Sequence, residues 1–95
     1  MTRSEFEKAL AKDSPPPMPA PLEALWWDAK NDWDAAHQAL QADDSRDSAW
    51  VHAYLHRKEG DLANAGYWYR RANRPAAASE LYVEWSEIVS ALTGQ

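Results

Sequence analysis

Two histidines and a glutamate share one stripe of a predicted helix. His52, His56 and Glu59 are spaced at i, i+4 and i+7, so on an ideal α-helix their side chains lie within about 60° of one another. Imidazole and carboxylate groups are ligands of zinc and of iron in proteins. With His37 or Asp28 from an earlier segment to complete the set, this spacing indicates a metal site as one interpretation.

The other interpretation gives the same histidines a structural role. Glu59 does not lie between the two histidines, as the general base does in an H-E-x-x-H motif, so hydrolytic chemistry gains no support. Buried histidines that hydrogen-bond to acidic, tyrosine or backbone groups are also common where no metal is bound. Under the repeat described below His37 matches Gly66, and we expect all three histidines to share the interior between two helical hairpins. The sequence leaves both interpretations open.

Aromatic and arginine side chains indicate a second kind of site. The chain carries six Trp, four Tyr and one Phe, more large rings than a two-layer helical module can easily bury. We therefore expect an aromatic surface that binds a protein, a small ligand or another copy of the chain. Its candidate contacts are Trp50, Tyr54 and Tyr67 for ring packing, with Arg57 and Arg71 for carboxylate pairing. A non-catalytic interaction module is the leading hypothesis. A small metal- or ligand-binding protein, with or without enzymatic activity, is the alternative.

The composition argues against several functional classes. Ten Lys and Arg against fifteen Asp and Glu give a formal charge of −5, which repels nucleic acid. No window approaches the roughly 18 apolar residues of a membrane span, and residues 1–7 lack the apolar core of a signal peptide. With no cysteine in the chain, we expect a cytoplasmic protein. No nucleophile motif or phosphate-binding glycine loop is present, so no catalytic residue is predicted, and no cofactor other than zinc or iron.

The elements that position these residues form a repeat. Residues 25–33 and 54–62 match at an offset of 29 residues, and a period of this size is typical of stacked helical hairpins. Asp32 and Asp61 are predicted helix N-caps, and Gly60 is a predicted left-handed helix end. The predicted helices cover about residues 4–12, 22–30, 32–42, 48–59, 61–73 and 77–92.

The chain divides into three predicted parts. Residues 1–12 form an N-terminal helix with Ser4 and Glu7 at capping-box spacing. Residues 13–21 contain five prolines and form a stiff, non-helical linker. Residues 22–95 form the helical domain. Its last helix carries an apolar stripe of Leu81, Trp85, Ile88 and Leu92. We expect this helix to cover the open end of the stack, because two repeats alone leave an apolar face exposed.

The segment after the central turn resembles the second helix of a tetratricopeptide repeat. The matching residues are Gly60, Asp61, Ala65, Tyr69 and Ala72. From the first repeat to the second, the chain resembles a family of small uncharacterised bacterial proteins, whose recurring words here are LWWDAK, DWDAAH, AWVHAYLHR and YWYRRA. The resemblance implies a tetratricopeptide-like fold. Together with the terminal helices predicted above, we expect an all-α fold: a tetratricopeptide-like array of two antiparallel helical hairpins with an N-terminal helix and a C-terminal capping helix. It carries no established activity.

Overall fold

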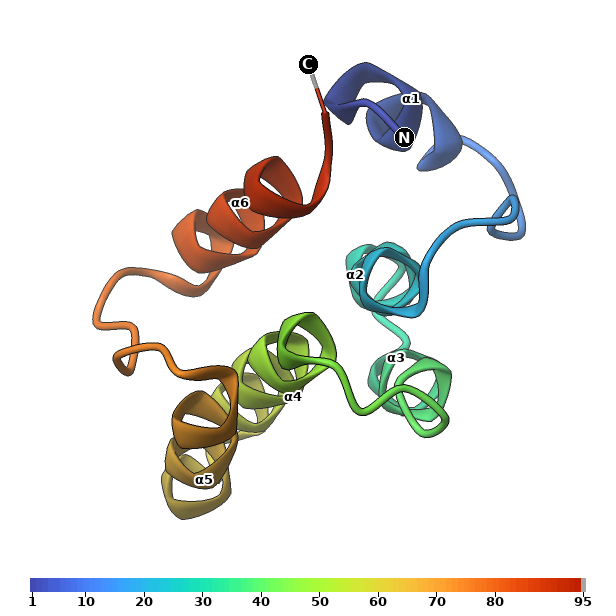
Figure 1. Cartoon of the computed structure of the whole chain (residues 1–95). Helices are drawn as coiled ribbons and strands as arrows, with labels where there is room; N and C mark the ends of the chain where they lie inside the picture. Colours follow the sequence, from blue (N-terminus) through green and yellow to red (C-terminus); the bar gives the residue numbers. More distant parts are fainter. Residues whose placement is uncertain (95) are drawn as a thin grey trace.

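The computed structural model describes residues 1–94, and the protein is all helical over this range. An isolated bridge between Thr2 and Gly94 is its only β-type pairing there, so the prediction of an all-α fold is confirmed. Within these residues no helix is both long and apolar enough to cross a membrane. The six helices are α1 (Arg3–Ala9), α2 (Ala20–Ala29), α3 (Trp33–Ala39), α4 (Arg46–Glu59), α5 (Leu62–Ala72) and α6 (Leu81–Leu92) (Figure 1).

The two turns of the repeat have the same local structure. Asn31 and Gly60, which match at the offset of 29 residues, have φ angles of 62° and 90°. Asp32 and Asp61 follow them, and each carboxylate accepts a hydrogen bond from the backbone N–H three residues further on, at 3.0 and 3.1 Å. Such a bond satisfies a free donor in the first turn of a helix. The predicted left-handed end at Gly60 and both predicted caps are confirmed.

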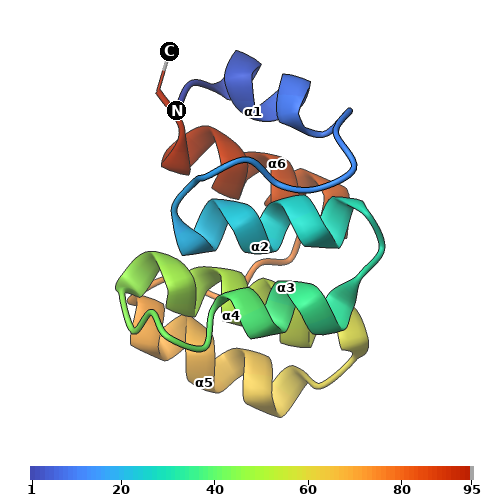
Figure 2. The same cartoon turned by 90° about the vertical axis from the view of Figure 1, so that its right-hand side faces the viewer.

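These turns join two pairs of packed helices. α2 packs against α3 and α4 packs against α5, while α4 also contacts α2, α3 and α6 (Figure 2). Small residues at the contacts, among them Ala24, Ala36, Ala53 and Ala65, are buried. Side chains without bulk let helix axes approach closely, which is why the alanines recur at matched positions of the two pairs.

The last helix occupies a different place from the one predicted. α6 packs against α2 and α4, and Ile88 and Val89 are fully buried; the helix therefore lies over the first helix of each pair. It also begins at Leu81, later than predicted, because Arg57 holds the preceding loop: its guanidinium donates to the Ser79 carbonyl and to the Glu84 carboxylate.

The N-terminal helix is joined to the same core. Phe6 and Ala9 are buried, and the indole N–H of Trp26 donates to the Ala9 carbonyl at 2.7 Å. The capping box uses Thr2 and Glu5, two residues before the predicted pair, so α1 begins before the predicted helix does. α1 also ends before the predicted end, at Ala9. α2 likewise begins before the end of the predicted linker. A proline in its first turn is tolerated, because the first N–H groups of a helix have no partner within it.

Truncating Trp85 tests whether α6 belongs to the core. Its indole donates to the Leu25 carbonyl of α2 at 3.2 Å and lies 6.0 Å from the Phe6 ring. We expect Trp85→Ala to lower the free energy of unfolding by about 3 kcal/mol, since it leaves a cavity and removes this hydrogen bond. Val83→Ala, at an exposed position of the same helix, should change that free energy by less than about 0.5 kcal/mol. Urea denaturation measures both variants, and equal small effects would show that α6 is dispensable for the core.

Candidate functional site

Three histidine side chains from two helices meet in one place. His37 belongs to α3, and His52 and His56 belong to α4. One ring nitrogen of each lies within 4.8 Å of a ring nitrogen of both others. His52 and His56 are buried, and His37 is half-buried. We call these three residues the histidine cluster.

The repeat brings the cluster together. The spacing of four residues places His52 and His56 on one face of α4, where their rings are nearly parallel, at 8°. α3 packs beside that face. Trp33, the first residue of α3, donates its indole N–H to the Leu55 carbonyl of α4 at 2.8 Å. One turn later, His37 stacks on the Trp33 ring with centroids 5.0 Å apart. The helix pairing and one hydrogen bond therefore fix where the third imidazole lies.

The opposite wall of the cluster comes from α5. Trp68 stacks on His52 with ring centroids 4.0 Å apart and an interplanar angle of 12°. The guanidinium of Arg71 lies 5.1 Å from the Trp68 ring centroid. Trp68 was not among the predicted site residues. Its spacing of three residues from Arg71 was the available signal, because residues three apart on a helix are neighbours on its surface.

The three imidazoles differ in their hydrogen bonds. His56 Nδ1 lies 2.6 Å from a carboxylate oxygen of Glu59, an arrangement in which the ring N–H donates and Nε2 keeps its lone pair. His37 Nδ1 lies 3.0 Å from the side-chain amide nitrogen of Gln41. His52 Nδ1 is buried and has no hydrogen-bond partner among residues 1–94. Since buried polar atoms almost always have a partner, this nitrogen calls for an explanation.

Burial lowers the pKa of two of the three histidines. The pKa of His52 is lowered to about 4, first by burial and then by the neighbouring His37, His56 and Arg71. The pKa of His37 is also lowered, first by burial and then by His56, with Glu59 and Asp34 opposing the change. At neutral pH both of these rings are therefore uncharged, and each carries one nitrogen lone pair. In His37 that lone pair is on Nδ1, where it accepts from the Gln41 amide.

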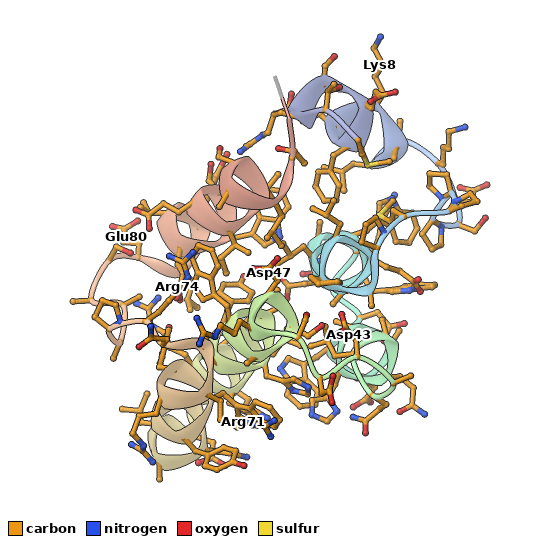
Figure 3. The ribbon with its side chains drawn as sticks, in the orientation of Figure 1. Lys8, Asp43, Asp47, Arg71, Arg74 and Glu80 are labelled. Atoms are coloured by element: carbon orange, nitrogen blue, oxygen red, sulfur yellow. The ribbon has the colours of Figure 1, made fainter. Side chains whose placement is uncertain are left out.

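A cavity of about 300 Å³ opens beside the cluster. His37, His52, Trp68 and Arg71 form one part of its lining. The rest comes from the end of α3, the connection between α3 and α4, and the start of α4: Leu40, Gln41, Asp43, Asp44, Ser45 and Ala49. Asp43 and Arg71, which approach the cavity from this connection and from α5, are labelled in Figure 3. His56 does not line the cavity, so the cluster has a closed side and an open side.

Two further residues that the sequence associated with a metal have other contacts. Glu59 contacts His56 Nδ1 and is not one of the three groups that converge in the cluster. It is close to Asp61 and His56 in a second, more exposed group. Asp28 is buried and accepts hydrogen bonds from the Tyr54 hydroxyl and the Lys58 ammonium, both at 2.8 Å. Its carboxylate is thus already satisfied.

The five residues predicted to bind a partner do not line one groove. Trp50 and Tyr54 are buried, with 6 and 3% of their surface exposed, and Arg57 is paired with the buried Glu84 at 2.9 Å. The sequence placed these three at the surface, but α4 has neighbours on several sides. Tyr54 is bonded to Asp28 of α2 and Arg57 to Glu84 of α6. The guanidinium of Arg74 lies over the Trp50 ring. Tyr67 is exposed on α5, and Arg71 of the same helix lines the cavity.

The free energy of unfolding should fall in mild acid because of His52. Its folded-state pKa of about 4 lies below the ordinary value of 6.5, so the unfolded chain binds a proton that the folded chain excludes. This stabilisation is complete above pH 6.5 and is lost as the pH falls toward 4. We expect a loss of about 2 kcal/mol between about pH 7.5 and about pH 5. Urea denaturation across this range measures it. A His52→Gln variant should show a shallower dependence, and an unchanged slope would contradict the assignment.

No family model matches the chain, and neither a curated protein nor a solved structure does so. The role of the histidine cluster is therefore inferred from its own geometry.

Proposed function

We propose that this protein binds a divalent transition metal ion, zinc or else iron, through His37, His52 and His56. The observation that carries the proposal is the convergence of three imidazole nitrogens, one from each ring, within 4.8 Å of one another. In one of these rings, that of His52, Nδ1 is buried without a hydrogen-bond partner. A metal ion would give an imidazole nitrogen lone pair at this site a partner.

The donor set fits these metals. Imidazole suits zinc, iron, copper and nickel, and three protein ligands with one open position are typical of catalytic rather than structural zinc sites. Ligand nitrogens around tetrahedral zinc are about 3.3 Å apart for zinc–nitrogen bonds of about 2.0–2.1 Å. The rings of the cluster would therefore draw together slightly on binding. The His37 side chain has room to turn, because it is half-buried beside a cavity.

In this proposal Glu59 positions the His56 ring and does not itself bind the ion. A histidine that binds a metal almost always donates its other ring N–H to a carboxylate, a carbonyl or water. The bond of 2.6 Å between His56 Nδ1 and Glu59 supplies such a contact and leaves Nε2 of His56 for the ion. The side-chain amide nitrogen of Gln41 donates to His37 Nδ1 at 3.0 Å. For His37 Nε2 to bind the ion, this amide would have to turn so that its oxygen accepts from Nδ1–H.

We also propose that the two helix pairs are tetratricopeptide-like repeats and that the chain is related to the small bacterial family it resembles. The matched turns at Asn31 and Gly60 and the matched caps at Asp32 and Asp61 support this.

An interaction module remains the second candidate function. The observation that favours it is the side of α5 with the exposed Tyr67 ring, where the Arg71 guanidinium lies 5.9 Å from the ring centroid. Exposed tyrosine and arginine side chains are enriched where proteins bind partners. This surface adjoins the histidine cluster through Trp68, whose ring contacts both Tyr67 and His52.

Metal content and a cobalt titration test the metal proposal. We expect one zinc or iron per chain in protein purified without a histidine tag, and one Co²⁺ bound per stripped chain. His37→Gln should weaken Co²⁺ binding at least about 100-fold, since it removes one of three ligands. Tyr67→Phe is the matched control and should bind normally. Circular dichroism checks the fold of both variants. Failure of the stripped, folded protein to bind Co²⁺ or Zn²⁺ stoichiometrically would refute the site.

Replacing Glu59 separates a positioning residue from a ligand. We expect Glu59→Gln to weaken Co²⁺ binding about 10–100-fold, the range seen when a group that orients a metal-bound histidine is lost. Glu87→Gln, on the exposed side of α6, is the control for the loss of one negative charge. Competition with a chelator of known affinity measures both. An affinity equal to that of the control would remove Glu59 from the site, and a loss as large as that of His37→Gln would make Glu59 a ligand.

A further inference from the structure

We propose that the cavity beside the histidine cluster binds a small monocarboxylate, with the carboxylate at the open position of the metal ion and in contact with Arg71. This inference rests on the proposed function, because the ion supplies one of the two positive partners. It adds the class of ligand, which the cluster alone does not define.

The lining of the cavity gives the direction of the open position. His37 and His52 border the cavity of about 300 Å³, whereas His56 does not. An ion held by all three imidazoles therefore has His56 on its closed side and the cavity on its open side. A site with three protein ligands keeps one position for water or for a ligand. That fourth partner must come from the cavity.

Arg71 provides an unused cation at the same cavity. Its guanidinium lies over Trp68, and Nη1 has only a long contact of 3.4 Å to the Tyr67 hydroxyl. No carboxylate forms a salt bridge with it within residues 1–94, in contrast to Arg3, which pairs with Glu7, and Arg57, which pairs with Glu84. A guanidinium stacked on an aromatic ring has its edge donors free for a carboxylate.

The opposite wall limits the charge that the cavity accepts. Asp43 and Asp44 line it. Asp43 already accepts hydrogen bonds from the hydroxyls of Ser45 and Ser48, at 3.2 and 2.7 Å, and the Ser48 bond is the largest cause of the lowered pKa of Asp43. It is therefore ionised at neutral pH. Two carboxylates repel a dianion such as phosphate more strongly than a monoanion. The positive charges of one guanidinium and one divalent metal ion exceed the negative charges of these two carboxylates by one, which a singly charged carboxylate neutralises.

The size and polarity of the cavity agree with a small ligand. A volume of about 300 Å³ lies at the lower end of the range for small-molecule sites. Leu40, Ala49 and the Trp68 ring contribute apolar lining, against which a short hydrocarbon chain can pack. Short aliphatic carboxylates combine the required charge with such a chain.

Spectroscopy of the Co²⁺-loaded full chain tests the inference. Acetate and propionate should change the visible absorption of the bound Co²⁺ in a saturable way at millimolar concentration, because a carboxylate replaces water at the open position. Arg71→Met should weaken acetate binding about 10-fold or more, through loss of a charge-assisted contact, while its affinity for Co²⁺ stays close to that of the unchanged chain. Arg70→Met, on the same helix and outside the cavity lining, is the matched control for charge.

The outcomes separate this inference from the metal proposal. Stoichiometric Co²⁺ binding with no spectral response to either carboxylate would overturn the carboxylate site and leave the metal site standing. Absence of Co²⁺ binding would overturn both. Inorganic phosphate that binds more tightly than acetate would overturn the assignment of a monoanion. Equal effects of Arg71→Met and Arg70→Met would overturn the contact with Arg71. Saturable acetate and propionate binding that depends on Arg71 alone would support the inference.

Discussion

The burial of α4 on several sides is the constraint on which the rest of the structure depends. Every residue from Ser48 to His56 is buried, although this stretch includes tyrosine and histidine side chains. A buried polar group without a partner destabilises a fold by about 1–3 kcal/mol, so the neighbouring helices must supply partners. Tyr54 is bonded to Asp28 of α2, which also accepts from Lys58, and Arg57 to Glu84 of α6. These bonds fix how α2 and α6 sit on α4, and α1 then closes over them.

The side of α4 that faces α3 and α5 is satisfied less completely. His52 and His56 are stacked or edge-packed against Trp68, Trp33 and His37, and aromatic contacts give imidazole rings favourable surroundings without hydrogen bonds. Nδ1 of His52, which has no partner among the described residues, is therefore the exception to the rule that buried polar atoms are hydrogen-bonded. Departures from such local rules concentrate at functional sites. His52 also lines the cavity. The buried nitrogen without a partner therefore belongs to a ring that a ligand can reach.

The repeat provides the scaffold, and its departures provide the chemistry. The caps and turns recur at an offset of 29 residues, but His37 stands where the second repeat has Gly66, and His56 where the first has Trp27. The cluster forms because the two repeats differ at positions that face each other across α3 and α4. Such a site, and not the fold, determines what a protein does, because one fold hosts many activities.

Local interactions are what the sequence by itself determined. Helix caps and turns depend on residues within one turn of each other, so Asp32, Gly60 and Asp61 could be placed without tertiary information. The i, i+4 spacing likewise put His52 and His56 on one face. Tertiary structure alone decided which faces became core. It buried Trp50 and Tyr54, paired Arg57 with Glu84 of α6, and placed Trp68 against His52. Burial depends on which helix packs where, and side chains distant in sequence supply the hydrogen bonds that settle the choice.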